Sequence, residues 1–436
     1  MITFLDGRLR HHDHRTAIVA IFALGLLFRL VWALRTGKGI LVGEAPNVAR
    51  AFARTGTFSD AFFVGQGPTA HLMPTTPLLA GMVHKLFGID THTTHVVLGL
   101  WSVAQVFASY VLLYLLFRRM GASRLALLIG AAVLNLVPIF AGVETLLAAY
   151  WESALAVDFG VAALLMLATY DGRRDIGWIP IFGASLLAAL CFFTNVLFGL
   201  GVYLAATIFV LRNFKGLKLA GVMLLAAALL ALVLAPWVIR NGRVMGETIL
   251  LRDNAGLELA IANYPGALHA ADPLEAYRQR IHGIHPFLSE AARQKLREAG
   301  GEAAYAGQLG GETKAWIRAN PGEFAQLSLR HLRQFYFPSA WQFRYTKSER
   351  AVEIRLMIHN VIAALGLVGV LWGLWRRERP FLFVAAVLLV PGLCYAPFQA
   401  MPRYVYVIYG LLVFAAADLV ARLIERAIPP ARSHRA

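Results

Sequence analysis

The chain has 436 residues, of which 58% are hydrophobic and only 15% are charged, and its formal net charge is +16. A soluble globular domain is typically about 45–50% apolar and about 25% charged, so the composition excludes an ordinary soluble protein and predicts a multi-pass membrane protein. The excess of Lys and Arg does not indicate a nucleic-acid partner. These residues concentrate beside apolar segments, where they set membrane topology and contact anionic lipid or phosphate.

Apolar segments of roughly 17–25 residues, the length that crosses a bilayer as a helix, predict about ten transmembrane helices. The segments are 16–34, 96–117, 125–141, 147–169, 178–193, 196–211, 219–239, 354–375, 381–397 and 404–423. Only Thr194 and Asn195 separate the fifth segment from the sixth. This spacing favours a tight hairpin, although a single broken helix over 178–211 is the alternative. The predicted fold class is an all-α polytopic membrane protein.

The basic residues predict how these helices are oriented. Alternate connections carry Lys and Arg, whereas the opposing short connections near 142–144, 194–195 and 399–401 carry none. Basic loops remain on the cytoplasmic side, so both termini are expected to be cytoplasmic and the segments 41–87 and 241–352 to lie outside. The long charged start is unlike a cleaved signal peptide, and we expect the first span to be a retained anchor.

The two outer segments are both expected to be helical. In the first, amphipathic spacing predicts a short helix over 44–52, and Pro77 opens another over 78–87 that is too short to span and suits the membrane interface. The second has turn residues near its start and then helical patterns near 273–282, 288–299, 302–319 and 321–335. The expected organisation is a transmembrane module over 1–240, an outer cap over 241–352 and C-terminal transmembrane helices over 353–436.

Carboxylates near the outer membrane face are the strongest candidates for chemistry. Glu44 follows the first span among apolar residues, where its pKa could be tuned for general-base catalysis; a Glu in a first helical turn also simply favours the helix dipole. Glu152 and Asp158 fall within the fourth predicted span, with Glu144 at its outer end, and carboxylates inside a membrane are functional hypotheses by default. Six residues apart, Glu152 and Asp158 lie on different helix faces. We expect Glu152 to reach the Glu44 site and Asp158 to be a buried hydrogen-bonding group.

A site for an anionic lipid substrate also needs cations at the outer interface. Arg240 and Arg243 follow a span in APWVIRNGR, and Arg403 precedes one in QAMPRYVYVIYG. A guanidinium can bind phosphate oxygens with two hydrogen bonds. The alternative is interfacial snorkelling within an aromatic belt that includes Tyr404. His71, in GPTAHLMP, could contact a substrate hydroxyl, or it could be a structural loop residue.

No motif predicts a resident metal or cofactor. The HHDH run at 11–14 looks like a metal cluster, but it belongs to an expected flexible segment on the cytoplasmic side. No Cys/His set has zinc spacing, no phosphate-binding glycine loop is found, and no GxSxG elbow is present. The site is therefore expected to work without a metal, a nucleotide or another cofactor.

In chain order, these motifs resemble the GT-C membrane glycosyltransferases, especially the bacterial branch similar to protein O-mannosyltransferases and the lipid A aminoarabinose transferase. In that family the first outer loop typically has an acidic residue, then an A-x-x-G-x-F stretch, then P-x-x-P before a short helix. The matching parts here are Glu44, ARTGTFSD and GPTAHLMPTTPLLAGMVHKLFG. PWVIRNGRVMG resembles a later loop of the family, Glu152 an acidic residue early in span four, and Arg403–Tyr404 an RY pair at a late span.

The resemblance implies transfer of a hexosyl or pentosyl group, usually with inversion, from a polyprenyl-phosphate carrier to a glycan, lipid or protein acceptor. The reaction would take place on the periplasmic face of a bacterial inner membrane. It implies Glu44 as the base, in a position where family members often carry Asp or an acidic pair, and Glu152 as a second acidic group. The residues expected to contact substrate are Arg240, Asn241, Arg243, Asn263, His71, Arg403 and Tyr404. The alternatives are a lipid or glycan flippase, a non-catalytic assembly subunit, and a polysaccharide polymerase or ligase.

Overall fold

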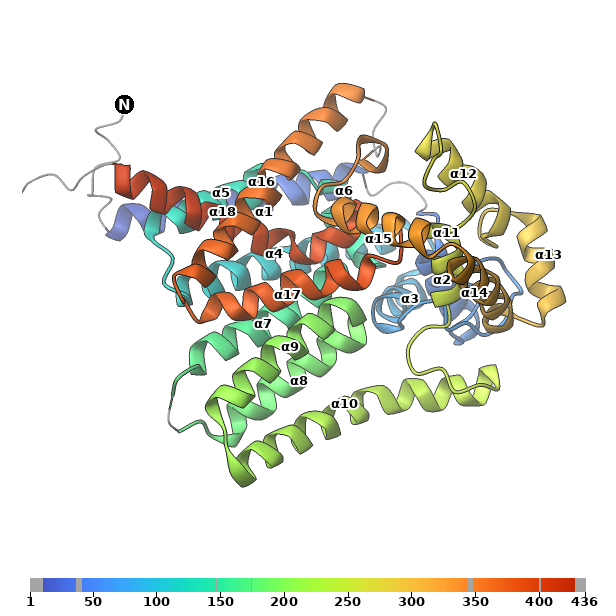
Figure 1. Cartoon of the computed structure of the whole chain (residues 1–436), viewed down its shortest axis with the longest axis horizontal. Coiled ribbons are helices and arrows are strands. Elements are labelled where there is room, and N and C mark those ends of the chain that lie inside the picture. The colour runs from blue at the N-terminus through green and yellow to red at the C-terminus, as the bar shows by residue number, and fades with distance from the viewer. Residues whose placement is uncertain are drawn as a thin grey trace, which may run out of the picture.

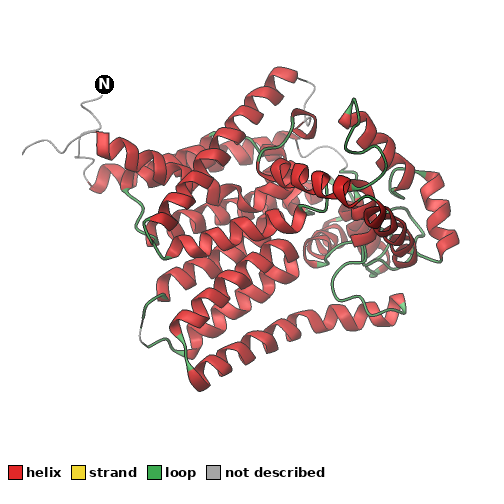
Figure 2. Ribbon diagram, in the orientation of Figure 1, coloured by secondary structure: helices red, strands yellow, loops and turns green. Residues whose placement is uncertain are grey.

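The computed structural model describes residues 11–36, 41–145, 147–173, 175–343, 348–399 and 401–427. Over these residues the chain is helical, and the one β-type pairing is an isolated bridge between Ser59 and Pro68 (Figure 2). The helices of the first half are α1 His11–Thr36, α2 Glu44–Thr55, α3 Thr75–Phe87, α4 His92–Arg119, α5 Arg124–Leu136, α6 Ala141–Thr145, η2 Leu147–Ala149, α7 Ser153–Tyr170, α8 Trp178–Thr194 and α9 Val196–Asn213. Those of the second half are α10 Gly216–Met245, α11 Ala255–Ala262, α12 Pro273–Ile284, α13 Glu290–Ala299, α14 Glu302–Ala319, α15 Pro321–Tyr336, η3 Ala340–Phe343, α16 Glu349–Trp375, α17 Pro380–Tyr395 and α18 Pro402–Ala427.

The long helices lie together as a bundle, and α2, α3 and α11 to α14 gather at one end of it (Figure 1). Within the described residues, seven helices are long and apolar enough to cross a membrane: α1, α4, α7, α9, α10, α16 and α18. The three other predicted spans appear as the shorter apolar helices α5, α8 and α17, of 13, 17 and 16 residues. Each of the ten predicted apolar segments therefore contains a helix, and the all-α polytopic class is confirmed.

The predicted hairpin over 178–211 is also confirmed. Helices α8 and α9 pack side by side with Asn195 alone between them (Figure 1). The Asn195 side-chain oxygen accepts a hydrogen bond from the Phe198 N–H and so caps the start of α9. Gly199 lies against the Phe192 backbone, where a side chain would have no room, so the two helices meet directly after the turn.

The fourth predicted span differs most from the structure. Helix α5 ends at Leu136, the short helices α6 and η2 follow, and α7 begins only at Ser153. The prediction that Glu152 lies inside a span was therefore wrong, because Glu152 immediately precedes α7. Asp158 does lie within α7 and accepts a hydrogen bond from Ser109 Oγ at 2.7 Å, as expected for a structural hydrogen-bonding group.

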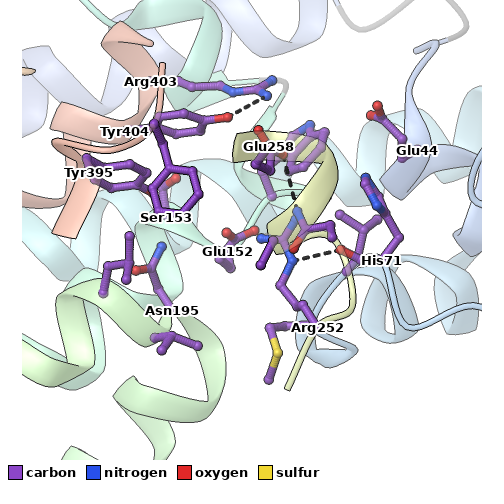
Figure 3. Close-up of a pocket in the computed structure, with 18 of the residues that line it drawn as sticks. Glu44, His71, Glu152, Ser153, Asn195, Arg252, Glu258, Tyr395, Arg403 and Tyr404 are labelled. Carbon is purple, nitrogen blue, oxygen red and sulfur yellow. Dashed lines mark hydrogen bonds between the residues drawn. The ribbon is translucent and has the colours of Figure 1, made fainter. Parts of the chain in front are cut away.

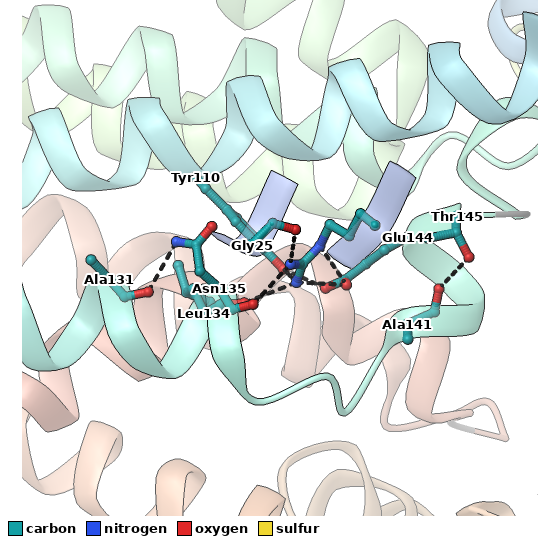
Figure 4. Close-up of polar contacts among 9 residues, drawn as sticks. Gly25, Tyr110, Ala131, Leu134, Asn135, Ala141, Glu144 and Thr145 are labelled. Carbon is teal, nitrogen blue, oxygen red and sulfur yellow. Dashed lines mark hydrogen bonds and ion pairs between the residues drawn. The ribbon is translucent and has the colours of Figure 1, made fainter. Parts of the chain in front are cut away.

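Helix α5 ends two residues before Pro138, and the carbonyls of Leu134 and Asn135 at its end belong to a buried polar network (Figure 4). Pro138 has no N–H, so the Leu134 carbonyl could not be paired by a longer helix. Arg29 of α1 donates to this carbonyl from Nη2 at 2.9 Å and to Asn135 O from Nη1 at 3.0 Å, so a side chain satisfies carbonyls left open at the end of α5. Its Nε donates to Glu144 Oε2 at 3.0 Å, and both side chains of this pair are at most 3% exposed. The Tyr110 hydroxyl donates to the other Glu144 oxygen.

The outer helices agree with the sequence patterns except near the start of the second outer segment. Helices α2, α3 and α12 to α15 match the predicted helices to within a few residues. However, α10 continues to Met245, and α11 forms where turns alone were expected. One apolar cluster joins Phe62 of the first outer loop to Leu257 and Leu309, and a second joins Val48 to Trp237. The two outer segments thus share a core over their described residues.

Candidate active site

A cavity of about 350 Å³ lies where the outer helices meet the ends of the transmembrane helices (Figure 3). Its lining comes from the first outer loop, the start of α7, the α8–α9 turn, the 251–258 segment, α12 and the ends of α17 and α18 that face each other. Five of the nine predicted site residues line it: Glu44, His71, Glu152, Arg403 and Tyr404. The structure therefore brings together residues that are more than 300 positions apart in the sequence.

Glu44 is presented to the cavity by the first turn of α2. Ala45 and Val48 bury one face of this helix, and Pro46 sits in the first turn, where its missing N–H has no helical partner to lose. Arg50 anchors the other side, because its Nε donates to Asp90 Oδ2 at 2.8 Å and its Nη2 donates to Leu41 O at 2.6 Å. These contacts fix the position of a carboxylate whose own side chain is 17% exposed.

A histidine that the sequence reasoning did not select faces Glu44. His285 follows the last residue of α12, and its Nε2 lies 3.6 Å from Glu44 Oε1. Phe62 packs edge-on against both the His285 and His71 rings. Burial lowers the pKa of His285, with Glu44 opposing this shift, and burial together with the nearby Arg252 charge lowers the pKa of His71 well below its ordinary value. Both imidazoles are therefore neutral near pH 7.

Glu44, His71 and His285 form the group in which a metal ion could be held. One ligand atom from each residue lies within 4.8 Å of the others. A carboxylate oxygen and neutral imidazole nitrogens suit zinc and similar divalent ions. The donor set fits such an ion chemically, whereas the HHDH run that resembled a metal cluster lies at 11–14, where the side chains of 11–13 are outside the described residues.

Arg403 and a group of aromatic rings line another part of the cavity. The Arg403 guanidinium lies over the Trp151 ring, 4.7 Å from its centroid, and its Nη2 donates to the Tyr404 hydroxyl at 3.4 Å. Tyr395 and Tyr404 stack with their centroids 4.9 Å apart. This arrangement places a cation next to aromatic faces. Glu152, directly after Trp151 in the chain, lines the same cavity (Figure 3).

Three further polar residues line the cavity and come from one short segment that sequence reasoning missed. Arg252 donates from Nε to His71 O at 2.7 Å, and Asn254 donates to Glu258 Oε1 at 3.2 Å. The sequence does hold a signal, since these residues interrupt an otherwise apolar stretch. Nothing in that stretch, however, specifies that it packs against the first outer loop.

The other four predicted substrate contacts do not line this cavity. Arg240 donates to Thr69 O at 2.7 Å and to Phe58 O, and it stacks on Trp237, so it anchors the first outer loop. Asn241 and Asn263 are buried and donate to the backbone at Ile249 O and Pro397 O. Arg243 lies exposed near the end of α10.

Comparison with known proteins bears on the fold. No protein-family model matches the sequence, and no curated protein matches it. Among solved structures, the chain is similar to the archaeal oligosaccharyltransferase AglB from Archaeoglobus fulgidus. The complex of that enzyme with an inhibitory peptide and a dolichol-phosphate gives a TM-score of 0.54 at 15% identity, over 97% of this chain and 53% of that one. Its complex with Zn and sulfate gives a TM-score of 0.54 at 13% identity, over 94% and 49%.

The chain shares its fold with this oligosaccharyltransferase over nearly all of its own length. ArnT from Cupriavidus metallidurans, bound to undecaprenyl phosphate, is also matched, with a TM-score of 0.37 and 13% identity over 93% of this chain and 78% of that one. This chain spans about half the length of AglB. The likeness therefore establishes the architecture, whereas the activity, donor and acceptor have to be argued from the site.

Proposed function

We propose that this protein is a glycosyltransferase that moves a sugar from a polyprenyl-phosphate carrier to an acceptor at the outer face of a bacterial inner membrane. The observation that carries the proposal is the Glu44 carboxylate, which lines a cavity at the junction of the transmembrane bundle and the outer helices. On this proposal the cavity is periplasmic and both termini are cytoplasmic. The fold shared with an oligosaccharyltransferase supports the reaction class, and that structure holds a dolichol-phosphate.

Glu44 is the proposed general base. It would take the proton from an acceptor hydroxyl or amide as that group attacks the anomeric carbon, and the bond from this carbon to the carrier phosphate would break with inversion. His285 Nε2, 3.6 Å from Glu44 Oε1, would hold the carboxylate in place and would affect how readily the carboxylate takes up the proton. Glu152 would hydrogen-bond sugar hydroxyls, since its carboxylate lines the same cavity.

The carrier phosphate would leave with added negative charge, and that charge has to be stabilised. Arg403 and Arg252 both line the cavity and supply positive charge within a largely buried space. Fixed cations of this kind are worth more in such a site than in water, and they are usually among the largest contributions to catalysis. Arg403, the second residue of α18, is the proposed main contact to the phosphate.

A direct test is turnover of a radiolabelled panel of polyprenyl-phosphate sugars by purified protein, with the Glu44→Gln variant alongside. The proposal expects release of carrier phosphate from at least one donor by the wild type and not by the variant. A flippase or an assembly subunit would tolerate Glu44→Gln. Equal donor binding by both proteins without any turnover would favour those alternatives. A polymerase or ligase would instead consume a lipid-linked glycan longer than a single sugar.

The transfer is proposed to need no resident metal, and this can be tested separately. If a divalent ion does belong to the site, Glu44, His71 and His285 would hold it, and the ion would supply charge stabilisation next to the acceptor. Metal analysis of the purified protein, and turnover before and after chelation, measure this. Turnover that survives complete chelation supports the metal-free reaction, whereas loss that zinc or manganese restores contradicts it.

A further inference from the structure

The tight turn between α8 and α9 brings polar side chains to a part of the cavity that the proposed base does not occupy. Thr194 ends α8 and Asn195 is the turn residue, and both line the cavity. Ser153, the first residue of α7, lines it as well. In Figure 3, Asn195 and Ser153 lie on the side away from Glu44. The base and the phosphate contact leave these three residues without a role in the reaction.

The Thr194 hydroxyl is buried and is not used by the protein. Thr194 is only 1% exposed, and its Oγ1 has no hydrogen-bond partner among the described residues. A helical threonine can donate to the carbonyl four residues earlier. Five others in the described part of the chain do so: Thr55, Thr145, Thr169, Thr207 and Thr313. A buried polar group without a partner costs free energy, so a free hydroxyl in the wall of a cavity points to a ligand group as its partner.

The neighbouring side chains also have unused hydrogen-bonding groups. Asn195 Oδ1 accepts the Phe198 N–H at 3.0 Å, whereas its Nδ2 donates to no residue that the structure describes. The Ser153 hydroxyl and the Glu152 carboxylate make no hydrogen bond within the described ranges either. Together with Thr194, these residues offer the cavity two hydroxyls, the N–H groups of one amide, and one carboxylate.

This combination of groups favours the hydroxyls of a sugar ring over a phosphate. A hydroxyl both donates and accepts, so a sugar can pair with the amide N–H groups, the carboxylate and the side-chain hydroxyls alike. A phosphate only accepts from such groups and would be repelled by the Glu152 carboxylate. The cations of the cavity that suit a phosphate, Arg252 and Arg403, come from other segments of the chain.

The turn holds these groups in place before any ligand binds. Asn195 caps α9, and Gly199 lies against the Phe192 backbone, so the two helices are fixed close to each other. Ser153 begins α7, and the positive end of this helix favours the negative charge of Glu152 directly before it. Side chains fixed on helix ends lose little freedom when they bind, which suits residues that select a substrate.

We propose that the α8–α9 turn and the start of α7 form the subsite for the sugar ring of the lipid-linked donor. The inference rests on the transferase function proposed above and adds to it the class of donor. This donor carries a sugar with at least two free ring hydroxyls, one bound by the Thr194 hydroxyl and another by the Glu152 carboxylate. Thr194 and Asn195 then select the sugar, whereas Arg403 binds the carrier phosphate that all such donors share.

Binding of carriers with and without a sugar tests the subsite in the full-length protein in lipid nanodiscs. The probes are undecaprenyl phosphate and a panel of undecaprenyl-phosphate sugars. The Kd of the bare carrier divided by that of the sugar-bearing carrier gives the contribution of the sugar, and for at least one sugar it should exceed one in the wild type. Thr194→Val should lower this ratio about three- to tenfold and leave the Kd of the bare carrier unchanged. Asn195→Asp, which keeps the oxygen that caps α9 and loses the N–H donors, should lower the ratio as well.

Two further measurements separate a sugar contact from a structural role. Thr194→Val should not lower the melting temperature, because the hydroxyl has no partner in the described protein to lose. The matched control is Thr207→Val, at an exposed residue of α9 whose hydroxyl donates to Tyr203 O, and it should change neither Kd. At one ring position, removal of the sugar hydroxyl should weaken binding to the wild type by the same factor as Thr194→Val does, and should not weaken binding to the variant further.

Three results would overturn the subsite: no sugar-bearing carrier binds the wild type more tightly than the bare carrier, Thr194→Val leaves the ratio unchanged, or it weakens both carriers equally. The third result would assign the hydroxyl to the phosphate instead. Because the assay needs no turnover, its outcome is independent of the transferase assay. Thr194-dependent binding of a sugar-bearing carrier without turnover of any donor would contradict the transferase and support the subsite.

Discussion

Two sets of carboxylates lie toward the end of the bundle where α2, α3 and α11 to α14 gather, and they differ in how completely they are partnered. Glu144 is 2% exposed, and both of its oxygens are bound, one by Arg29 and the other by the Tyr110 hydroxyl. In contrast, Glu44 has an imidazole at 3.6 Å, and the Glu152 side chain makes no hydrogen bond or ion pair with any described residue. The first set is satisfied by the protein itself, and the second is not.

This difference distinguishes carboxylates that stabilise the fold from carboxylates that are available to bind or react with a substrate. A buried ion pair with all its hydrogen bonds made has no capacity left for a substrate, and its removal leaves an uncompensated charge. Arg29 uses all five of its N–H groups, on Glu144, Tyr110 and three backbone carbonyls. A carboxylate that faces a cavity with few partners can still bind a hydroxyl or take a proton. A charged side chain near the membrane is thus insufficient evidence of function. A better indication is a carboxylate whose hydrogen-bonding capacity is not used up by the protein itself.

Glu44→Gln should have the largest effect on turnover. The amide keeps the shape of the side chain and cannot accept a proton, so donor consumption should fall by about 10²- to 10⁴-fold. The melting temperature should stay near that of the wild type, because the carboxylate makes no short hydrogen bond. Full turnover by the variant would contradict Glu44 as the base and would favour Glu152 or Glu258, which line the same cavity. Glu312→Gln, the same change at an exposed carboxylate of α14, controls for the loss of a charge.

Glu144→Gln should have the opposite profile. It leaves Arg29 charged and buried without a carboxylate, which typically costs about 3–5 kcal/mol. Chemical unfolding in detergent should show this loss, while the variant that remains folded should still bind donor. A double variant, Arg29→Met with Glu144→Leu, should recover much of the stability, because it removes both charges together. If Glu144→Gln were as stable as the wild type but inactive, the comparison of the two sets would be wrong.

Arg403→Lys should have an intermediate effect. Lysine keeps the charge and loses the planar fork that stacks over Trp151 and donates to Tyr404. Donor turnover should fall by about 10- to 100-fold, with little change in stability. The useful measurement is inhibition by free polyprenyl phosphate compared with inhibition by an uncharged prenyl alcohol. Weaker inhibition by the phosphate alone would place the carrier phosphate at Arg403, and equal weakening of both would contradict that role.

The sequence predicted the elements well because their signals are local. Apolar length marked the ten helical segments, and helical patterns marked the outer helices from 273 to 335. It failed at the end of α5 and the start of α7, because one predicted span ran through Pro138 and the next began at Leu147, in the chain that forms η2. Pro138 is a local signal for the end of α5, whereas no local pattern records the contact of Arg29 with the last carbonyls of that helix. The extended predicted span then placed Glu152 inside the membrane, although it lies at the start of α7 and lines the cavity.

The candidate site was predicted only in part, because some of its residues have local signals and others are brought in by tertiary packing. Glu44, His71, Arg403 and Tyr404 stand out by position and by their resemblance to a known family, and they do line one cavity. His285 closes the end of an outer helix and has no distinguishing spacing. Its role depends on the packing of α12 against the first outer loop through the Phe62 ring. That packing is a tertiary property, which no local pattern in the sequence marks.

Two neighbouring arginines provide the smallest and most discriminating test. Both Arg240 and Arg243 were predicted to bind phosphate, but Arg240 is occupied by carbonyls of the first outer loop, whereas Arg243 is exposed. Arg243→Gln should therefore change turnover by less than about twofold and leave stability within about 0.5 kcal/mol. Arg240→Gln should lower the melting temperature and leave the apparent affinity for the donor of the folded protein nearly unchanged. If Arg243→Gln instead weakened donor binding without affecting stability, the carrier would extend beyond the cavity along α10. Arg243, although exposed, would then be a substrate-binding residue like the unpartnered carboxylates.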